Sequence, residues 1–341
     1  MTIHGGAATV KVMSHPATVV DVAAAAGVSR QTVSNALNSP ERVRPATLSR
    51  VQAAIDSLGY RPHGAARRLR TRQSSTLGIR LEPVRGISGA VLDRFLHALV
   101  ESADQHGLRI LLFTAKNDHD ELAHMENLVE GSDVDGFVLT STGYGDPRPE
   151  WLGKREIPFV TFGRPWQLDD VSNAVHPWVD VDGRSGVREA TSQLLQLGHR
   201  RIGFLGWPNL SGQGDERRQG WVEAMTAAGC AAAVDLSCED DASLATEAVA
   251  SAEAGGARLE ALVCASDTLA LGARLHLPLS VPVVGYDDTP VAEALGISSV
   301  AQPLVEAASA VVELLAGSKR APADDASSRR LLQPHVVWRS N

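Results

Sequence analysis

The polar side chains of residues 30–38 have the chemistry and the spacing required to contact DNA. On a helix over this segment, one side carries the apolar residues Val33, Ala36 and Leu37. The other side carries amide, hydroxyl and guanidinium groups: Arg30, Gln31, Ser34, Asn35 and Asn38. Such groups hydrogen-bond base edges and phosphates when a helix lies in a major groove. An ordinary amphipathic helix with a solvated polar side is the alternative.

A second candidate DNA contact is Leu69, the one large apolar side chain in a short basic segment. Arginines lie on both sides of it: Arg67, Arg68, Arg70 and Arg72. A leucine in such a setting can wedge between base steps of a minor groove while the arginines hold the backbone. A disordered basic linker is the alternative.

Other residues have the chemistry to hold a small polar molecule. Asp287 follows an apolar strand, so its carboxylate is expected at the carboxyl end of a sheet, where it can accept two hydroxyl hydrogen bonds. Arg217 offers a planar fork of donors, and Trp178 and Trp207 offer apolar faces to a sugar ring. The alternatives are a surface ion pair for the charged residues and a core position for the tryptophans.

Two short helices and a tight turn must position the polar side of residues 30–38. Thr18 and Asp21 fit a capping box at the start of the first helix. Gly27 supplies a left-handed turn, and Ser29 can cap the second helix, which runs to about Asn38.

A third helix, starting at Pro45 and stopping at Gly59, is expected to complete a three-helix core. Its apolar side consists of Leu48, Val51, Ile55 and Leu58. Basic residues flank it as phosphate contacts: Arg42, Arg44 and Arg50.

From Leu77 onward, short apolar strands alternate with longer amphipathic helices. Strands are predicted at 76–81, 109–114, 136–140, 159–162, 201–206, 261–264 and 283–286. Helices are predicted at 90–106, 118–130, 183–197, 215–228, 244–254, 268–275 and 303–316. This alternation predicts an α/β fold of parallel sheets flanked by helices, with ligands outside the carboxyl ends of the strands. Two such sheets in sequence predict two similar lobes around a cleft.

The charge of the chain is divided unevenly. Residues 1–75 hold ten Arg or Lys and three Asp or Glu, a net of +7, whereas the remainder holds 22 and 37, a net of −15. A basic end on an acidic protein suits DNA binding confined to that end.

Composition and motifs narrow the class of protein further. The three cysteines have no metal-ligand spacing, so we expect free thiols in a reduced, cytoplasmic setting. No apolar run approaches the ~20 residues that span a bilayer, so we expect no membrane association. Glycine-rich phosphate loops and nucleophile motifs of enzymes are absent from the sequence. We expect no enzyme activity, no cofactor and no metal.

Several ordered motifs together resemble one protein family. At the start these are V-D-V-A-x-x-A-G-V-S-x-x-T-V-S at 20–34, Asn38, Val43, Thr47, L-G-Y-x-P at 58–62 and A-R-x-L at 66–69. Later ones are L-G-H-R-R-I-G-F-L-G at 197–206, R-R-Q-G-W at 217–221, S-D-T-L-A-L-G at 266–272 and V-V-G-Y-D-D-T at 283–289. The chain resembles the LacI/GalR (lactose-repressor) family of bacterial transcription regulators, whose effector core is similar to periplasmic sugar-binding proteins.

The resemblance implies a DNA interface contributed by the helices, the turns and a hinge helix. Its residues are Thr18, Ser29, Arg30, Gln31, Thr32, Ser34, Asn35, Asn38, Arg42, Arg44, Thr47, Tyr60, His63, Ala66, Arg67 and Leu69. By resemblance, the hinge helix folds only when two subunits sit on an operator, and Leu69 intercalates. Asn35 stands where many members carry arginine, so the family's base preference is not transferred to it.

The resemblance also implies a set of effector contacts, with two departures from the family. The expected residues are Arg164, Trp178, Trp207, Arg217, Ser266, Asp287 and Gln302. Ser266 stands where many members have Asn or Asp, and Arg164 lies where the lactose repressor has a sugar-binding Asp. A galactoside is therefore not assumed. Arg164 either serves an acidic or phosphorylated sugar or pairs with a local carboxylate.

The predicted organisation follows from these motifs. It comprises a disordered leader at 1–16, a three-helix head with a helix-turn-helix at 17–62, a hinge helix and linker at 63–75 and a core at 76–341. Within the core, lobe 1 is expected at about 76–174 and 303–333, and lobe 2 at about 175–302 and 334–341. The heptad-repeat tail that joins lactose-repressor dimers into tetramers is missing, so a homodimer is expected.

The function expected from the sequence is a repressor of transcription. It would bind a pseudo-palindromic operator and lose affinity for it when a small sugar-like effector occupies the cleft. A corepressor-dependent regulator and a sugar-binding module without DNA-linked regulation are the alternatives.

Overall fold

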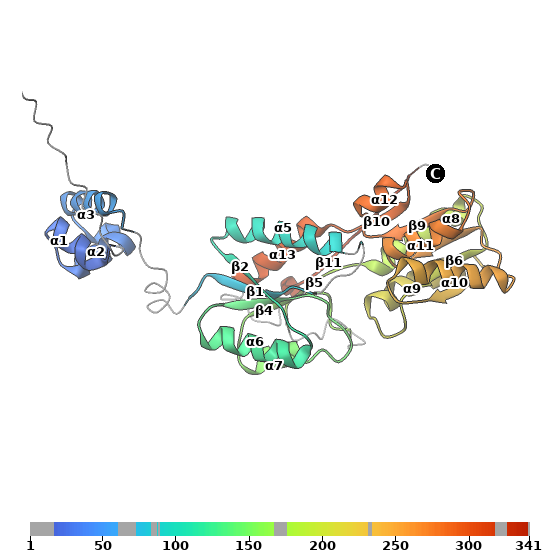
Figure 1. Cartoon of the computed structure of the whole chain (residues 1–341), viewed down its shortest axis with the longest axis horizontal. Helices are drawn as coiled ribbons and strands as arrows, with labels where there is room; N and C mark the ends of the chain where they lie inside the picture. Colours follow the sequence, from blue (N-terminus) through green and yellow to red (C-terminus); the bar gives the residue numbers. More distant parts are fainter. Residues whose placement is uncertain are drawn as a thin grey trace, which may run out of the picture. The chain divides into compact units, whose positions relative to one another are not determined.

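The computed structural model divides the chain into two compact units, residues 1–73 and 74–341 (Figure 1). The residues that it describes are 17–60, 73–82, 87, 89–166, 176–230, 234–317 and 326–339. The predicted leader at 1–16 and the predicted hinge residues His63, Ala66, Arg67 and Leu69 lie outside the described residues.

The first unit is a bundle of short helices whose ends are set by the caps that the sequence predicts. Its elements are α1 (Val19–Ala26), α2 (Arg30–Asn38), the 3₁₀ turn η1 (Pro40–Arg42) and α3 (Pro45–Leu58). The capping box is present: the backbone N–H of Thr18 donates to Asp21 Oδ2 at 2.8 Å, and Thr18 Oγ1 accepts from the backbone N–H of Asp21 at 3.4 Å. Gly27 has a φ of 63°, which ends α1, and Ser29 Oγ caps α2 by accepting from Thr32 N at 3.1 Å.

The small residues of α1 allow the three helices of this unit to pack closely. The buried core consists of Val22, Ala23, Ala26, Val33, Val51 and Ala54. Partly buried residues around it are Val19, Val28, Ala36, Leu37, Ile55, Leu58 and Tyr60. Leu48 was predicted to lie in this core, but its side chain is half-buried outside the cluster. Ala54 of the same helix lies in the core instead.

The second unit contains two open sheets. The first has the order β11-β5-β4-β3-β1-β2, and all its pairs are parallel. Its strands are β1 (Thr76–Arg80), β2 (Arg109–Phe113), β3 (Gly136–Leu139), β4 (Phe159–Phe162), β5 (Trp178–Val181) and β11 (Arg329–Leu332). Helices α5 (Gly89–Gln105) and α13 (Leu304–Gly317) cover one face, and α6 (Asp118–Glu130) and α7 (Arg148–Lys154) cover the other (Figure 1).

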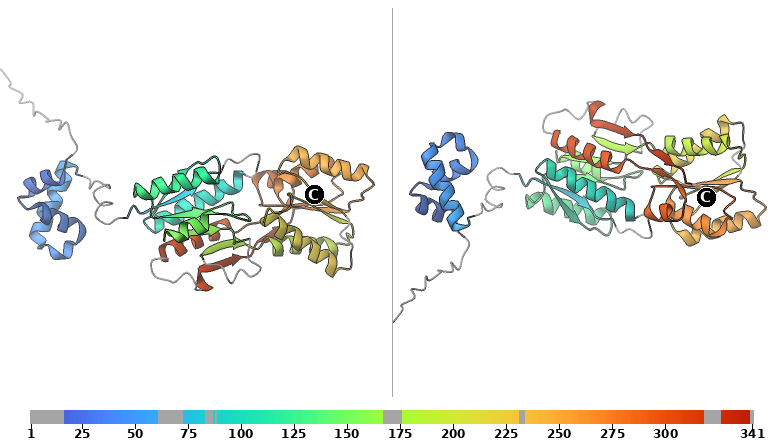
Figure 2. Two further views of the ribbon diagram at one scale, coloured as in Figure 1. Left: turned by 90° about the horizontal axis from the view of Figure 1, so that it is seen from below. Right: turned by 90° about the horizontal axis from the view of Figure 1, so that it is seen from above.

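The second sheet has the order β12-β10-β9-β8-β6-β7, parallel except for the antiparallel pair β10–β12. Its strands are β6 (Ile202–Gly206), β7 (Asp235–Ser237), β8 (Ala261–Cys264), β9 (Val283–Tyr286), β10 (Ser298–Ala301) and β12 (His335–Val337). The pair α8 (Gly183–Gln196) and α9 (Gln213–Ala227) lies on the side opposite α10 (Ala242–Ala254) and α11 (Asp267–His276) (Figure 2). The short helix α12 (Pro290–Ala294) and the turn η4 (Ala326–Ser328) complete the described elements.

The strands and helices predicted in this unit are all present, with ends within two residues of the predicted ones. The elements that the sequence analysis missed are short or carry polar residues: β5, β7, β10, β11, β12, α7 and α12. A three-residue strand such as Asp235–Ser237 presents too few side chains to show a period.

One predicted lobe boundary is wrong. The predicted boundary places residues from about 175 onward in lobe 2, but β5 belongs to the first sheet, where Trp178 pairs with Thr161 of β4 and with Arg329 of β11. The chain therefore first crosses to the second lobe after Val181. It returns after β10 and crosses once more between β11 and β12.

The two lobes have separate hydrophobic cores. In the second lobe, Trp221 is fully buried and its Nε1 donates to the carbonyl of Ile202 at 3.1 Å. In the first lobe, the cores lie on both faces of the sheet, around Leu99 and Val311 on one side and around Phe137 and Met125 on the other. Within the described part of the chain, no helix has both the length and the apolar character needed to cross a membrane.

Candidate DNA-binding and effector-binding sites

The polar side of α2 faces away from the head core. Val33 on the inner side is fully buried, whereas Arg30, Gln31 and Asn38 on the outer side are exposed. Ser34 and Asn35 are half-buried beside them. The structure therefore brings five of the six predicted contacts in α2 to one helix face, and Thr32 is the sixth.

Local hydrogen bonds order this face. Gln31 Nε2 donates to Asn35 Oδ1 at 3.0 Å, one helical turn further on. Asn38 Nδ2 donates to the carbonyl oxygen of Ser34 at 2.6 Å. Paired amides have less rotamer freedom to lose on binding, which favours recognition of a fixed pattern of base edges.

The charge at the start of α2 favours an anion. Arg30 is the first residue of this helix, and its first turn has no acidic residue. A cation at a helix N-terminus opposes the helix dipole by a few tenths to about 1 kcal/mol, so helix stability does not explain its presence. A phosphate at the same place would be held by both the arginine and the free N–H groups of the first turn.

The remaining predicted DNA contacts that lie among the described residues differ in their surroundings. Thr18, Ser29 and Thr32 take part in helix capping, so each has a structural role as well. Arg42 and Arg44 are exposed, and Arg42 Nε lies 3.8 Å from the carboxylate of Glu41. Thr47 is half-buried on α3, and Tyr60 packs partly buried against the head core.

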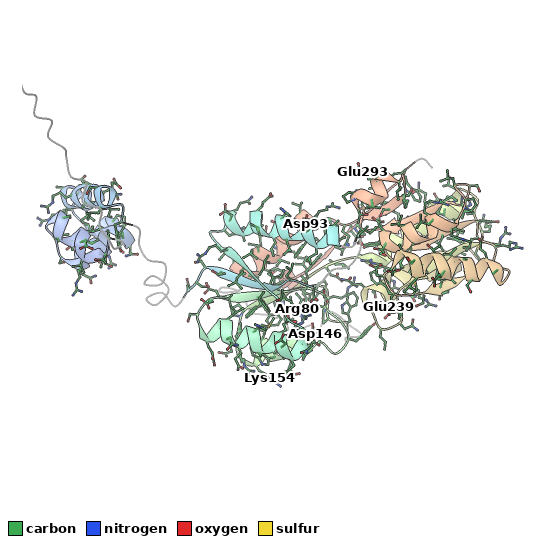
Figure 3. The ribbon with its side chains drawn as sticks, viewed as in Figure 1. Arg80, Asp93, Asp146, Lys154, Glu239 and Glu293 are labelled. Atoms are coloured by element: carbon green, nitrogen blue, oxygen red, sulfur yellow. The ribbon has the colours of Figure 1, made fainter. Side chains whose placement is uncertain are left out.

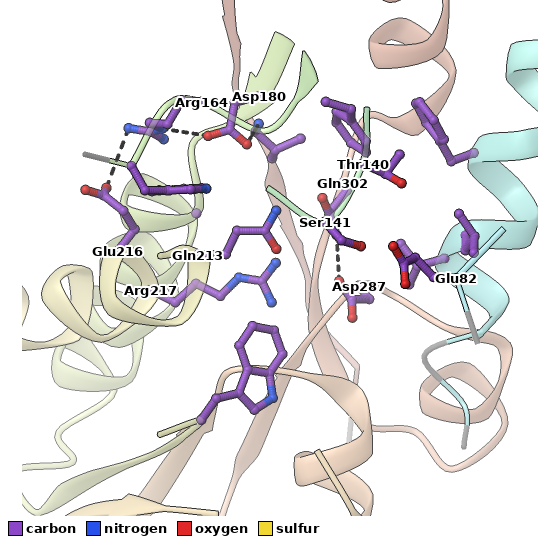
Figure 4. A pocket seen from close by; sticks show the side chains of 18 of the residues that line it. Glu82, Thr140, Ser141, Arg164, Asp180, Gln213, Glu216, Arg217, Asp287 and Gln302 are labelled. Atoms are coloured by element: carbon purple, nitrogen blue, oxygen red, sulfur yellow. Dashed lines mark hydrogen bonds and ion pairs between the residues drawn. The ribbon is translucent and has the colours of Figure 1, made fainter. Parts of the chain in front are cut away.

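In the second unit, a pocket of about 270 Å³ lies where the carboxyl ends of the two sheets face each other (Figure 4). Both sheets reverse their strand order, at β1/β3 and at β6/β8, and such points are where open α/β sheets bind ligands. The residues that follow strands and line the pocket are Glu82, Thr140, Ser141, Arg164, Trp207, Asp240, Asp287 and Gln302. Helix α9 contributes Gln213, Glu216 and Arg217 to the lining, and strand β5 contributes Asp180.

Five of the seven predicted effector residues line this pocket: Arg164, Trp207, Arg217, Asp287 and Gln302. The structure does not place the other two there. Trp178 lies in β5 with only 4% of its surface exposed, because the strand is covered on both faces. Ser266 is 1% exposed and caps α11 by accepting from Leu269 N at 3.2 Å, so it lies behind the lining.

Asp287 is the most constrained residue of the pocket. It is 6% exposed, and its Oδ1 accepts from Gln302 Nε2 at 2.6 Å. Burial raises the pKa of its carboxyl to about 7, Arg217 opposes this rise, and the negative charges of Asp267 and Asp240 add to it.

The backbone at Asp287 is strained and is held in place by its neighbours. Its φ of 109° is unfavourable for a residue with a side chain. The backbone N–H of Asp287 donates to Val300 O at 2.8 Å, and that of Asp288 donates to Ser299 Oγ at 2.9 Å. Arg94 of α5 reaches the carbonyl oxygens of Asp287 and Asp288 from the first lobe, at 3.4 and 3.1 Å. Strain that is fixed in this way is typical of a functional position.

A buried carboxylate beneath this loop fixes its geometry. Asp267 accepts from Thr289 N at 2.7 Å, from Thr289 Oγ1 at 2.8 Å and from Ser299 Oγ at 2.6 Å. Gly285 allows this approach, because a Cβ at that position would lie 2.1 Å from Asp267 Oδ1. The S-D-T motif at 266–268 thus supports the loop that carries Asp287.

Arg217 projects into the pocket from α9 with 5% of its surface exposed. Its Nη1 donates to the carbonyl oxygen of Ala265 at 2.5 Å. The guanidinium lies 3.6 Å from the ring centroid of Tyr286 and 5.1 Å from that of Trp207. Two aromatic faces and one hydrogen bond hold the fork of donors toward the cavity.

Arg164 is paired with carboxylates from both lobes. Its Nε donates to Asp180 Oδ2 at 2.6 Å, and its Nη1 lies 3.7 Å from Glu216 Oε2 (Figure 4). Of the two roles that the sequence left open, the structure shows the pairing with a local carboxylate.

A buried ion network positions the first-lobe side of the pocket. Glu121 is fully buried and accepts from Arg80 Nη1 at 2.6 Å and from Arg148 Nη1 at 3.1 Å. Arg148 also binds Asp146 and donates to the carbonyl of Thr140 at 2.9 Å (Figure 3 labels Arg80 and Asp146). The network holds together the segments that follow β1 and β3, which contribute Glu82, Thr140 and Ser141 to the lining.

Several lining residues were not among those predicted: Glu82, Thr140, Ser141, Trp166, Asp180, Gln213, Glu216 and Asp240. Glu82 and Ser141 follow predicted strands, so the rule that found Asp287 applies to them equally. Asp240 follows the unpredicted strand β7, and its Oδ1 accepts from Trp207 Nε1 at 3.1 Å and from Ser266 Oγ at 2.5 Å. It had no signal in the sequence.

Comparison with known proteins places the chain in a family. Residues 18–63 match the model for "Bacterial regulatory proteins, lacI family", and residues 191–340 match a periplasmic binding protein-like domain. The HTH-type transcriptional regulator CelR of Thermobifida fusca is 33% identical, over 94% of this chain and 96% of that protein. The regulator GalS of Salmonella typhimurium is 29% identical, over 95% of this chain and 98% of that protein.

Solved structures give the same result. A complex of the transcriptional regulator CelR with cellobiose is 29% identical with a TM-score of 0.69, covering 95% of this chain and 99% of that one. The Lac repressor dimer bound to operator and the anti-inducer ONPF has a TM-score of 0.80 at 22% identity, covering 95% and 98%, which shows the shared fold. The chain therefore belongs to the lacI family of bacterial regulatory proteins, and it is a DNA-binding transcriptional regulator rather than an enzyme.

Proposed function

We propose that this regulator is a repressor that binds a pseudo-palindromic operator as a homodimer in the cytoplasm and releases it when a sugar binds the pocket. The observation that carries the proposal is the set of groups converging on the cavity. Asp287 and Gln302 supply oxygen and amide groups for hydroxyls, Arg217 supplies donors, and Trp207 supplies an apolar face. This combination suits a polyol with an apolar ring side.

The arrangement of the lining supports control by the ligand. Glu82 and Ser141 come from the first lobe, and Asp287 and Arg217 come from the second, so one ligand contacts both. The Arg94 contacts to the carbonyls of Asp287 and Asp288 already join the lobes beside the ligand position. A ligand that favours one angle between the lobes shifts a two-state equilibrium by its difference in affinity for the two states.

The experiment is the binding of the full chain to its operator fragment at one fixed salt concentration, with cellobiose and other neutral sugars added singly. Cellobiose is the first probe because the related CelR is solved in complex with it. The proposal predicts that one sugar weakens operator binding and that Asp287→Asn abolishes this response without preventing operator binding.

Two other results would assign a different function. Operator binding that appears only with an added metabolite would indicate a corepressor-dependent regulator. Sugar binding without any specific operator binding would indicate a sugar-binding module, and Leu69→Ala would then change nothing. Under the proposal, Leu69→Ala weakens operator binding and leaves sugar affinity intact.

A further inference from the structure

The effector pocket has an excess of acidic side chains. Among the described residues that line it, five carry carboxylates: Glu82, Asp180, Glu216, Asp240 and Asp287. The basic residues of the same lining are Arg164 and Arg217. An anionic ligand entering this space would therefore meet more negative than positive charge in a partly buried setting, where charges are screened less than in bulk water.

Both arginines are already engaged. Arg164 lies between Asp180 and Glu216, and an anion could bind it only by competing with those two carboxylates. Arg217 donates to Ala265 O and is stacked on Tyr286, with the Asp287 carboxylate close enough for the arginine to lower its pKa. A phosphate or carboxylate placed at Arg217 would therefore also lie near Asp287.

Three of these carboxylates are paired with arginines, Glu82 with Arg80 at 3.3 Å and both Asp180 and Glu216 with Arg164, but the lining still holds more acidic than basic side chains. Burial raises the pKa of Glu82 as well as that of Asp287. The negative charge of Asp240 contributes to the rise at Asp287. Hydroxyl groups can donate to such carboxylates and replace the lost water, whereas a further negative charge cannot.

We infer that the pocket selects an uncharged polyhydroxylated sugar over acidic and phosphorylated sugars, and that Asp240 is a specificity-determining residue through its negative charge. This inference rests on the proposed function, because it specifies the class of sugar bound at the same site. It assigns Arg164 to joining the lobes through Asp180 and Glu216 rather than to holding an anionic group of the ligand.

The surroundings of Asp240 allow its charge to be tested separately from its hydrogen bonds. Its Oδ1 accepts from Trp207 Nε1 and from Ser266 Oγ. The amide oxygen of asparagine can accept both bonds, so Asp240→Asn removes the charge and keeps the acceptor that orients the indole. Glu239 is an exposed neighbour outside the pocket lining, so Glu239→Gln is a control with the same change of charge (Figure 3).

The test is calorimetric titration of the full chain with matched pairs of sugars at fixed salt and pH 8. The pairs keep the pyranose ring closed and differ in charge: glucose with glucuronate, glucose with glucose 6-phosphate, and cellobiose with its 6′-phosphate. We expect each neutral sugar that binds to do so about tenfold or more tightly than its acidic partner. Asp240→Asn should reduce this ratio severalfold, and Glu239→Gln should leave it unchanged.

Each contrary result has a distinct meaning. An acidic sugar that binds as tightly as its neutral partner overturns the inference and leaves a sugar-responsive regulator intact. Equal ratios in wild type and Asp240→Asn, with both proteins folded by circular dichroism, overturn the role of Asp240. Binding of no sugar at all overturns the sugar effector of the proposed function and this inference with it.

Discussion

The polar face of α2, where we propose DNA binding, and the pocket between the two sheets, where we propose effector binding, are built in opposite ways. The head face consists of polar residues on one nine-residue helix, is mostly exposed, and is ordered by bonds between residues four apart. The pocket gathers residues from Glu82 to Gln302 by the topology of two sheets, and three of its charged groups, Asp180, Arg217 and Asp287, are buried. A substitution in the head should thus act locally, whereas one in the pocket acts through burial, charge and the packing of distant segments.

Trp221→Ala should give the largest difference between the two regions, because it should destabilise the core and leave the stability of the head unchanged. This side chain is fully buried in the second lobe, and truncation of a core tryptophan lowers the free energy of unfolding by about 3–5 kcal/mol. Urea unfolding should show the loss in the unit 74–341, while the helices of the head keep their own transition. A loss below about 1 kcal/mol would contradict the packing described here.

Gln31→Ala or Asn35→Ala should have the next largest effect, and the effect should be limited to DNA binding. Loss of a base-reading amide costs about 1–3 kcal/mol of discrimination at one base pair, so operator affinity should fall while sugar affinity stays unchanged. Arg44→Ala serves as a comparison: loss of a phosphate contact should weaken all sequences alike and reduce the salt dependence of binding. If Gln31→Ala weakened specific and non-specific DNA equally, the proposed base contact would be wrong.

The pocket, unlike the head, should respond to pH near neutrality. The pKa of Asp287 is raised to about 7 in the folded chain, so at pH 6 the protonated form predominates and cannot accept two hydroxyl bonds. Sugar affinity should therefore rise as the pH increases from 6 to 8, by at most about tenfold per unit. Asp287→Asn should make affinity independent of pH in this window, measured by calorimetry at each pH.

The stability of the core should change with pH in the opposite direction. Because the folded pKa of Asp287 is raised, its contribution to stability is fully present below its unfolded value of 3.8 and is lost as the pH rises through about 7. The free energy of unfolding of wild type should fall relative to Asp287→Asn between pH 4 and pH 7. A difference between the two proteins that does not vary with pH would show that the carboxyl has an ordinary pKa.

The smallest expected effect is in the head. Ser29 Oγ caps α2 by accepting from Thr32 N, and loss of such a cap costs about 1 kcal/mol. Ser29→Ala should lower the head's thermal transition and leave that of the core unchanged. Ser29→Asp, which retains a capping oxygen, should keep the transition near that of the wild type; an unchanged transition in Ser29→Ala would contradict the capping role.

The same contrast explains what could be predicted from the sequence. The caps at Thr18 and Ser29 and the turn at Gly27 follow from local chemistry, so the head could be predicted almost residue by residue. In the core, periodicity indicates the long helices and apolar strands, and the position after β9 marks Asp287. β5 was not predicted because its sequence, Trp-Val-Asp-Val, places a charged residue in a strand that only the fold buries.

The charged neighbours within the pocket could not be predicted from the sequence. The Asp180 partner of Arg164 and the Asp240 partner of Trp207 become neighbours only when strands far apart in the chain are aligned. Trp178 and Trp207 are the same residue type near strands, yet Trp178 lies inside the first sheet and Trp207 follows the carboxyl end of β6 in the second sheet. Sequence position alone does not separate these two cases.

Under the proposed function, the pocket and the DNA-binding head are coupled by a free energy that an effector can change. The most direct test measures this coupling from both sides: operator affinity with and without saturating cellobiose, or whichever neutral sugar binds, and the affinity for that sugar with and without operator. The account predicts that sugar weakens operator binding and that operator weakens sugar binding by the same factor. Operator affinity that stays constant or rises when a bound sugar saturates the pocket would contradict it.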